Sequence, residues 1–149
     1  MINYDLKRIK ALVFDIDGVL SAETIQVGAD GLPMRTVNIK DGYALQLAVK
    51  MGLHVAIITG GHSEAIRLRY EGLGIRDIYM RAAVKTREFS LLLEKYGLQP
   101  EEVLYMGDDI PDYEVMTKAI DLCDYKAVQE LYKEIIAKWG RLDVLVNNA

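Results

Sequence analysis

Short apolar runs alternate with longer amphipathic segments along most of the chain. We expect strands where consecutive positions are mostly apolar, at residues 10–16, 53–59, 77–80 and 103–107. We expect helices where apolar residues recur at helical spacing, at residues 41–51, 63–72, 86–96 and 111–119. This alternation predicts an α/β fold, a three-layer Rossmann-like parallel sheet with helices on both faces. No large insertion interrupts the pattern, so we expect no separate cap domain.

A small insertion follows the first predicted strand. Residues 24–28 and 34–39 are expected to form a β-hairpin, because glycine and proline gather at the turn between them. The apolar side chains available on this hairpin are Val27, Leu32, Met34 and Val37. They either pack on their own domain or form an interface with another chain.

Two carboxylates come directly after the first apolar run. Asp15 and Asp17 are two positions apart, so in a strand they would emerge side by side on one face, and Gly18 then allows a sharp turn. Two neighbouring carboxylates repel each other unless a cation lies between them or one keeps its proton. The pair therefore predicts a Mg²⁺ site or a nucleophile beside a general acid. The alternative is an ordinary strand end with solvated side chains.

The same design recurs at two later strand ends. Gly107 is followed by Asp108 and Asp109, with Asp112 three residues further on. Between the two acidic clusters, a strand ends in Thr59-Gly60-Gly61 and a helix follows, which is a favourable arrangement for binding phosphate. Lys85 is available as a cation, although an ordinary helix-start or surface lysine is the alternative. For Thr59 the alternative is a cap at the strand end. Because ligands of parallel sheets bind outside the carboxyl ends of the strands, we expect one shared site.

These motifs together resemble those of the haloacid dehalogenase-like phosphatases, in the same order along the chain. Within that superfamily the chain resembles most the 3-deoxy-D-manno-octulosonate 8-phosphate phosphatases, over residues 1–119. The closer match rests on three stretches: Asp17-Gly-Val-Leu-Ser-Ala, Val37-Asn-Ile-Lys-Asp-Gly-Tyr-Ala-Leu and Gly107-Asp-Asp-Ile-Pro-Asp-Tyr-Glu-Val-Met. The resemblance implies a Mg²⁺-dependent phosphomonoesterase that hydrolyses a sugar-acid phosphate. It also implies that the hairpin helps to build a homo-oligomer, a tetramer in that family.

The resemblance assigns a role to each motif residue. Asp15 would be the nucleophile that forms an aspartyl-phosphate, and Asp17 would be the general acid and base. Mg²⁺ would be held by oxygen atoms of three residues: the Asp15 side chain, the Asp17 backbone carbonyl and Asp108. The phosphoryl oxygens would be held by Thr59, the Gly60 amide and Lys85. Asp109 and Asp112 would orient Lys85 or the metal-bound waters.

One position near the phosphate motif departs from the family pattern. Gly61-His62 stands where these phosphatases commonly have a basic arginine. His62 either substitutes in part for that cation below its pKa of roughly 6.5 or is simply an exposed loop residue.

Composition agrees with a small enzyme that has its own core. The chain has 149 residues, 51% of them hydrophobic, and a net charge of −4 at pH 7, which does not favour nucleic acid as a partner. The single cysteine, Cys123, excludes an internal disulfide and suits a reducing compartment, so we expect a cytoplasmic protein. We expect neither a signal peptide nor a transmembrane helix, and no membrane partner.

The last 30 or so residues depart from the phosphatase pattern altogether. Residues 120–149 resemble a β-α-β piece of a short-chain dehydrogenase, on Asp121-Leu-Cys-Asp124, Trp139-Gly-Arg-Leu-Asp-Val-Leu-Val and Asn147-Asn148-Ala149. No Gly-x-Gly-x-x-Gly loop for a dinucleotide is present. We interpret the chain as a single α/β domain, with residues 1–119 as its phosphatase-like body and residues 120–149 completing the sheet.

The abrupt change near residue 119 suggests an engineered chimera, with natural divergence as the alternative. An alternative function follows from it. The chain would then be a chimeric scaffold or oligomerisation domain with little or no activity.

Overall fold

The computed structural model describes residues 6–116 and residue 133 of the chain. The chain divides into two compact units, Met1–Thr117 and Lys118–Ala149, and the described fold belongs to the first. The strand, helix and final strand expected within residues 120–149, and their addition to the sheet, lie outside the described residues.

A parallel sheet forms the centre of the first unit. Its strands are β1 (Ala11–Phe14), β4 (His54–Ile58), β5 (Asp77–Tyr79) and β6 (Val103–Met106), in the order β5-β4-β1-β6. Phe14 at the end of β1 lies opposite Ile57 on one side and Met106 on the other, so the carboxyl ends of three strands are level. The chain adds strands on one side of β1 and then crosses to the other, which makes the carboxyl end of β1 the expected place for a ligand.

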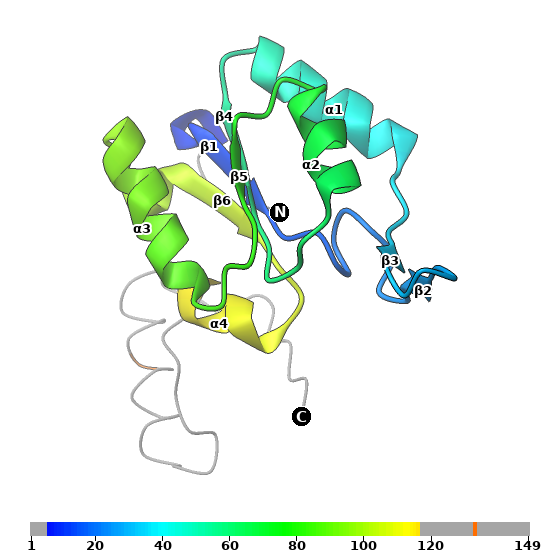
Figure 1. Ribbon diagram of the computed structural model, residues 1–149. Coiled ribbons are helices and arrows are strands. Elements are labelled where there is room, and N and C mark those ends of the chain that lie inside the picture. Colours follow the sequence, from blue (N-terminus) through cyan, green and yellow to red (C-terminus); the bar gives the residue numbers. More distant parts are fainter. Residues whose placement is uncertain (1–5, 117–132, 134–149) are drawn as a thin grey trace. The chain divides into compact units, whose positions relative to one another are not determined.

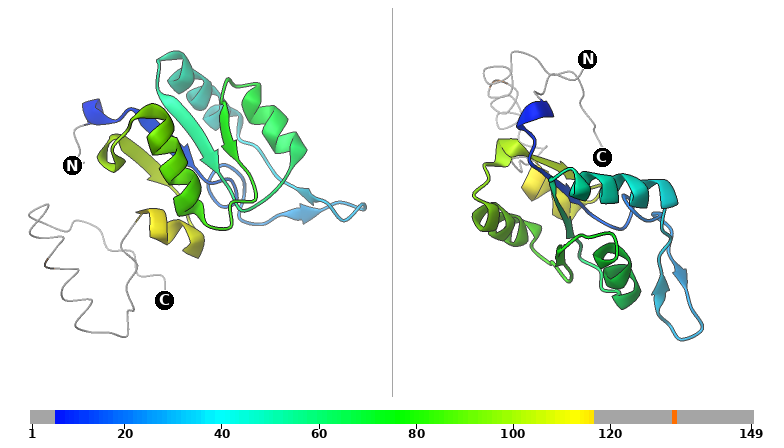
Figure 2. Two further views of the ribbon diagram at one scale, coloured as in Figure 1. Left: turned by 60° about the vertical axis from the view of Figure 1, so that its left-hand side comes forward. Right: turned by 90° about the horizontal axis from the view of Figure 1, so that it is seen from above.

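Helices cover both faces of this sheet. They are α1 (Ile39–Lys50), α2 (Glu64–Glu71), α3 (Lys85–Tyr96) and α4 (Ile110–Met116), with short 3-10 helices η1 (Leu6–Arg8) and η2 (Pro100–Glu102) before β1 and β6. Figures 1 and 2 show α1 and α2 on one face and α3, with α4 beside it, on the other. The predicted α/β fold is confirmed. The strands are shorter than predicted, because strand pairing ends before the apolar pattern does.

Strand β4 shows how the core fixes the site. Its alternate side chains face opposite sides of the sheet, as the period of two requires. Val55 and Ile57 pack in the cluster that includes Leu45 of α1 and Ile66 of α2, whereas Ala56 and Ile58 pack in the cluster around Leu92 of α3. Burying a large apolar side chain stabilises the fold by about 1.5–3 kcal/mol. The strand end that carries Thr59 is therefore held from both faces.

The predicted hairpin is also present, but residues 35–39 of its expected second strand are not paired, and Ile39 begins α1. Strand β2 (Gln26–Val27) pairs antiparallel with β3 (Pro33–Met34), and the two extend away from the sheet (Figure 2). The exposed fractions of Val27, Leu32 and Met34 are 69%, 62% and 53%. The interpretation that these side chains pack on their own domain is therefore wrong, and the interpretation as an interface with another chain stays a prediction.

Candidate active site

Asp15 lies one residue beyond β1 and is buried, with 5% of its surface exposed. Its backbone N–H donates to the Met106 carbonyl at 2.9 Å, which ties the residue to the end of β6. Its carboxylate accepts the Ile16 N–H at 2.6 Å on Oδ1 and the Lys85 ammonium at 2.7 Å on Oδ2. The predicted nucleophile is therefore fixed in one orientation at the centre of the sheet edge.

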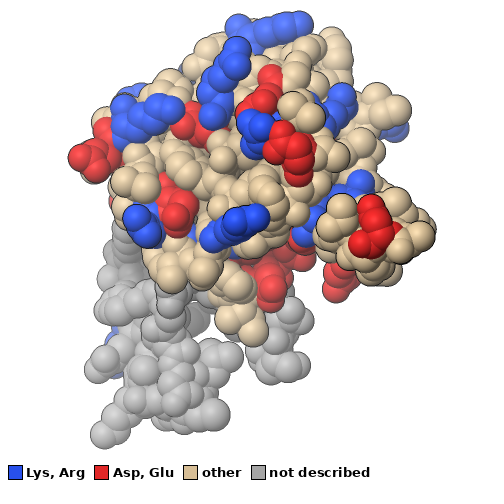
Figure 3. Space-filling view, in the orientation of Figure 1, with Lys and Arg blue, Asp and Glu red and all other residues tan. Residues whose placement is uncertain are grey.

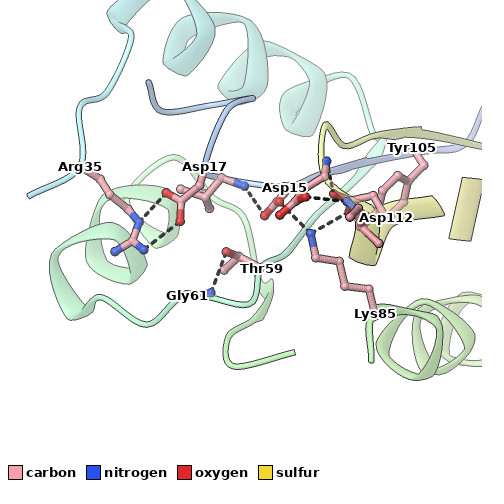
Figure 4. A network of polar contacts seen from close by, with 11 residues as sticks. Asp15, Asp17, Arg35, Thr59, Gly61, Lys85, Tyr105 and Asp112 are labelled. Carbon is pink, nitrogen blue, oxygen red and sulfur yellow. Dashed lines mark hydrogen bonds and ion pairs between the residues drawn. The ribbon is translucent and has the colours of Figure 1, made fainter. Parts of the chain in front are cut away.

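Lys85 is the first residue of α3, and its side chain is 3% exposed. Its Nζ donates to Asp15 Oδ2 and to Asp112 Oδ1, each at 2.7 Å (Figure 4). Burial by itself lowers the pKa of Lys85, but the hydrogen bonds and charges of Asp112 and Asp15 outweigh it and raise the pKa above its ordinary value. Lys85 is thus a buried ammonium at neutral pH. It does begin a helix, as the alternative interpretation held, but it is not a surface lysine.

Asp112, in the first turn of α4, completes this network. Its Oδ1 accepts the Tyr105 hydroxyl at 2.6 Å as well as Lys85, and its Oδ2 accepts the Asp109 N–H at 3.3 Å. Burial and the hydrogen bond to Asp112 raise the pKa of Tyr105, so the phenol keeps its proton and remains a donor. Tyr105 was not among the residues predicted for the site, because it stands within the apolar run before Gly107.

Three carboxylates gather close enough to share one cation. Oxygen atoms of Asp15, Asp108 and Asp112 all lie within 4.8 Å of one another. Partial burial and the negative charges of Asp15 and Asp112 raise the pKa of Asp108. A Cβ at Gly18, where φ is +81°, would collide with the Asp108 carboxylate, so only glycine allows this approach. An all-oxygen donor set of this kind suits Mg²⁺.

The carboxylate cluster contains two of the three predicted metal ligands. Asp15 and Asp108 lie together as expected, and the third carboxylate of the cluster is Asp112. Asp17 was predicted to bind the metal through its backbone carbonyl. Its carboxylate is not in the cluster and pairs with Arg35 instead. Asp109, predicted to orient Lys85 or metal-bound waters, accepts the Ile110 N–H at 2.7 Å on its side chain. Its role in the site remains a prediction.

Asp17 is not paired with Asp15 in the way the strand period suggested. Strand β1 ends at Phe14, and the chain then turns, with the N–H groups of Leu20 and Ser21 donating to the Ile16 carbonyl. The period of two no longer applies beyond the strand, and the two carboxylates point to different cations. Figure 4 shows Asp15 turned toward Lys85 and Asp17 turned toward Arg35.

Arg35, directly after β3, makes a two-point ion pair with Asp17. Its Nε lies 2.6 Å from Asp17 Oδ1, and its Nη2 lies 2.9 Å from Oδ2. The hydrogen bonds to Asp17 raise the pKa of Arg35 above its ordinary value. Arg35 was not among the predicted site residues either, because only the apolar side chains of the hairpin pointed to a function. The available signal was a basic residue at the end of a hairpin that starts near Asp17.

The predicted phosphate-binding segment lies between the two ion pairs. Thr59 is buried at the end of β4, and its hydroxyl oxygen accepts the Gly61 N–H at 3.2 Å. Gly60 is exposed, and α2 begins soon after it with Ser63 as its N-cap. His62 is exposed, which agrees with the interpretation as a loop residue. The Gly61 N–H is thus already occupied by Thr59, and phosphate binding by Thr59 and the Gly60 N–H remains a prediction.

The surface near the site is acidic. Figure 3 shows Asp and Glu gathered along the edge between α4 and the hairpin, where the strands end. Elsewhere on this face Lys and Arg alternate with acidic residues and form no basic patch. An anionic substrate therefore needs local cations, and Lys85 and a bound divalent ion are the groups that fit its phosphoryl group.

Comparisons with known proteins agree with this geometry. The model of the haloacid dehalogenase-like hydrolases matches residues 36–119. The 3-deoxy-D-manno-octulosonate 8-phosphate phosphatase of Escherichia coli K12 is 40% identical over 112 residues, which are 75% of this chain and 60% of that protein. The Yersinia pestis enzyme is 36% identical over 110 residues, 74% of this chain and 59% of that protein. The chain thus spans about 60% of the length of these relatives.

Solved structures give the same result. The Yersinia pestis phosphatase superimposes with a TM-score of 0.72 at 35% identity, over 74% of this chain and 60% of that one. The Moraxella catarrhalis phosphatase, in complex with magnesium ion, phosphate ion and KDO, superimposes with a TM-score of 0.69 at 33% identity, over 73% and 63%. These findings lend no support to the dehydrogenase resemblance of residues 120–149 or to an engineered chimera.

Proposed function

The chain belongs to the haloacid dehalogenase-like hydrolases, and from that premise we propose that it is a Mg²⁺-dependent phosphomonoesterase acting on a sugar-acid phosphate of the 3-deoxy-D-manno-octulosonate 8-phosphate type. The observation that carries the proposal is the buried Lys85 ammonium, 2.7 Å from both Asp15 and Asp112, beside the carboxylate cluster. Residues far apart in the sequence meet there at one sheet edge, which supports a shared site for a phosphoryl group and a cation.

The donor set favours Mg²⁺ as the cofactor. Asp15, Asp108 and Asp112 offer carboxylate oxygens, and the Asp17 carbonyl is the further ligand that the family pattern predicts. When bound, Mg²⁺ would screen the charge that the carboxylates and the phosphoryl group bring together. Lys85 then holds Asp15 in place and presents its charge to a phosphoryl oxygen, while Thr59 and the Gly60 N–H provide hydrogen bonds to the others.

The reaction divides into two transfers of the phosphoryl group. An Asp15 carboxylate oxygen attacks phosphorus, the bond from phosphorus to the sugar oxygen breaks, and Asp17 gives a proton to that oxygen. Asp17 then takes a proton from the water that attacks the aspartyl-phosphate, which releases inorganic phosphate and restores the Asp15 carboxylate. Asp17 is suited to this part because its carboxylate is one-third exposed, whereas that of Asp15 is buried.

Phosphate release tests this proposal directly. We would measure it from 3-deoxy-D-manno-octulosonate 8-phosphate and from p-nitrophenyl phosphate, with Mg²⁺ and with a chelator. Activity should need Mg²⁺ and vanish in Asp15→Asn, whereas the matched control Asp30→Asn, at the exposed hairpin turn, should keep it. If the folded wild-type protein releases no phosphate from either substrate, the alternative of a scaffold without activity is the correct one.

We also propose that the chain is a homo-oligomer, a tetramer on the family pattern. The exposed apolar side chains of the hairpin support this, because Val27 and Leu32 would otherwise face water. Light scattering should give a mass well above one chain, and Val27→Asp with Leu32→Asp should lower it. A monomeric wild-type protein would contradict the proposal.

The proposed compartment is the cytoplasm, on the basis of the single cysteine. Within residues 6–116, none of the helices has the length and apolar character needed to cross a bilayer.

A further inference from the structure

Arg35 has no role in the phosphoryl transfer proposed above, although it pairs with Asp17. The buried centre of the site, formed by Asp15, Lys85 and Asp112, is devoted to the phosphoryl group and the metal. Arg35 lies at the opposite end of the network, beyond Asp17 (Figure 4). Asp17 is the proposed proton donor to the leaving oxygen, so a cation on its far side would lie toward the leaving group and not toward the phosphoryl group.

The backbone at Gly61 makes room for this guanidinium. A Cβ at position 61 would lie 2.6 Å from Arg35 Nη2 and 3.5 Å from Asp17 Oδ2. Any side chain at this position would therefore compete with Arg35 for space. Gly61, directly after the predicted phosphate-binding residues, has no side chain, and the Arg35 guanidinium from the hairpin lies in the space that a side chain would fill.

The guanidinium also has hydrogen-bonding capacity to spare. Its side chain is 7% exposed, and Nη1 is buried with no hydrogen-bond partner among the described residues. A buried donor without a partner costs free energy, so this position gains by taking an acceptor. The planar guanidinium binds carboxylates through two parallel hydrogen bonds, as it already does with Asp17.

We propose that Arg35 determines substrate specificity by binding the carboxylate of the sugar acid as the leaving group enters the site. This inference rests on the proposed function, which supplies the sugar-acid substrate. Arg35 exchanges part of its pairing with Asp17 for the substrate carboxylate, which needs a side-chain rotation and no change of fold. The exchange also frees Asp17 to face the leaving oxygen. A sugar phosphate without a carboxylate gains no binding energy from Arg35.

Steady-state kinetics on matched substrates test the proposal. The substrates are 3-deoxy-D-manno-octulosonate 8-phosphate and D-mannose 6-phosphate, which has a primary phosphate but no carboxylate. Arg35→Gln should lower kcat/KM for the sugar acid about 10- to 100-fold, the effect of losing a charged hydrogen bond, mainly through KM. The same change should alter kcat/KM for mannose 6-phosphate less than about threefold. Arg35→Lys should restore part of the loss, and Arg76→Gln, an exposed arginine before β5, is the matched control.

A binding measurement separates recognition from chemistry. Free 3-deoxy-D-manno-octulosonate should inhibit the wild-type enzyme competitively, and Arg35→Gln should weaken that inhibition by a similar factor. Equal losses of kcat/KM on both substrates, or unchanged inhibition by the free sugar acid, would overturn the inference.

Separate outcomes distinguish a failure of the Arg35 inference from a failure of the proposed function. Absence of Mg²⁺-dependent phosphate release in the wild-type enzyme contradicts the phosphatase proposal. Activity that is equal on the two sugars contradicts the sugar-acid substrate. Thermal unfolding of each variant shows whether a loss arises from misfolding, and Arg35→Lys provides the comparison if Arg35→Gln is unstable.

Discussion

Replacing Lys85 by methionine should reveal how strongly the site depends on one buried charge. Methionine keeps most of the side-chain volume but removes the ammonium that lies 2.7 Å from Asp15 and from Asp112. Both carboxylates are at least nine-tenths buried, so the variant leaves two negative charges facing each other without their cation. Removing one partner from a buried ion pair costs about 3–5 kcal/mol.

We expect a loss near the lower end of that range. Asp112 keeps the Tyr105 hydroxyl, and Asp15 keeps the Ile16 N–H, so neither carboxylate loses every hydrogen bond. A loss of about 3 kcal/mol corresponds to a fall in Tm of roughly 10–15 °C for a domain of this size. Urea unfolding of the metal-free protein at neutral pH gives the free energy directly. Lys50→Met, at an exposed position on α1, should cost less than about 0.5 kcal/mol.

The pH dependence of this difference provides a second check. The pKa of Lys85 is raised in the folded state, so its contribution is fully present below the unfolded lysine pKa of about 10.4. The contribution is lost as the pH rises through the folded pKa. The gap in unfolding free energy between wild type and Lys85→Met should therefore be constant from pH 7 to about 9 and shrink only at higher pH. A variant as stable as the wild type would refute the reasoning, and so would a gap that closes below pH 8.

Two further substitutions test neighbouring parts of the site. Tyr105→Phe removes the 2.6 Å hydrogen bond to Asp112 and should lower the free energy of unfolding by about 1–3 kcal/mol, as urea unfolding can measure. Kinetics should show a larger loss of kcat than of substrate affinity, and an unchanged kcat would contradict a role of Tyr105 in holding Asp112. Partial burial and the negative charge of Asp15 raise the pKa of Asp108, so Asp108→Asn should make the metal-free protein slightly more stable at neutral pH. Thermal shifts with Mg²⁺ should disappear in this variant, and a retained shift would exclude Asp108 as a ligand.

Local signals predicted the elements well. The helix α3 is an example, because apolar residues such as Phe89 and Leu92 recur at helical spacing and Gly97 ends the helix with φ at +61°. The strand ends were less well predicted. Strand β1 stops at Phe14, two residues short of the expected limit, because pairing with both neighbours ends there and the turn around Ile16 begins.

The motif residues were predictable because their chemistry is tied to fixed places in the fold. Apolar strands that end in glycine and carboxylates bring Asp15 and Asp108 to the same edge of a parallel sheet. Arg35 and Tyr105 belong to no such motif. Arg35 meets Asp17 across 18 positions of the sequence, through a hairpin whose path no local pattern specifies.

The amino-acid sequence was enough to predict the succession of strands and helices, the parallel sheet and the residues that gather at its carboxyl edge. These follow from hydrophobic periodicity and from turn residues, which act over a few neighbouring positions. The partner of each charge became known only from the folded chain, in which Lys85 lies between Asp15 and Asp112 and Arg35 pairs with Asp17. The reason is that a buried charge must be neutralised by whatever opposite charge lies within hydrogen-bonding distance, and that distance exists only once the chain is folded.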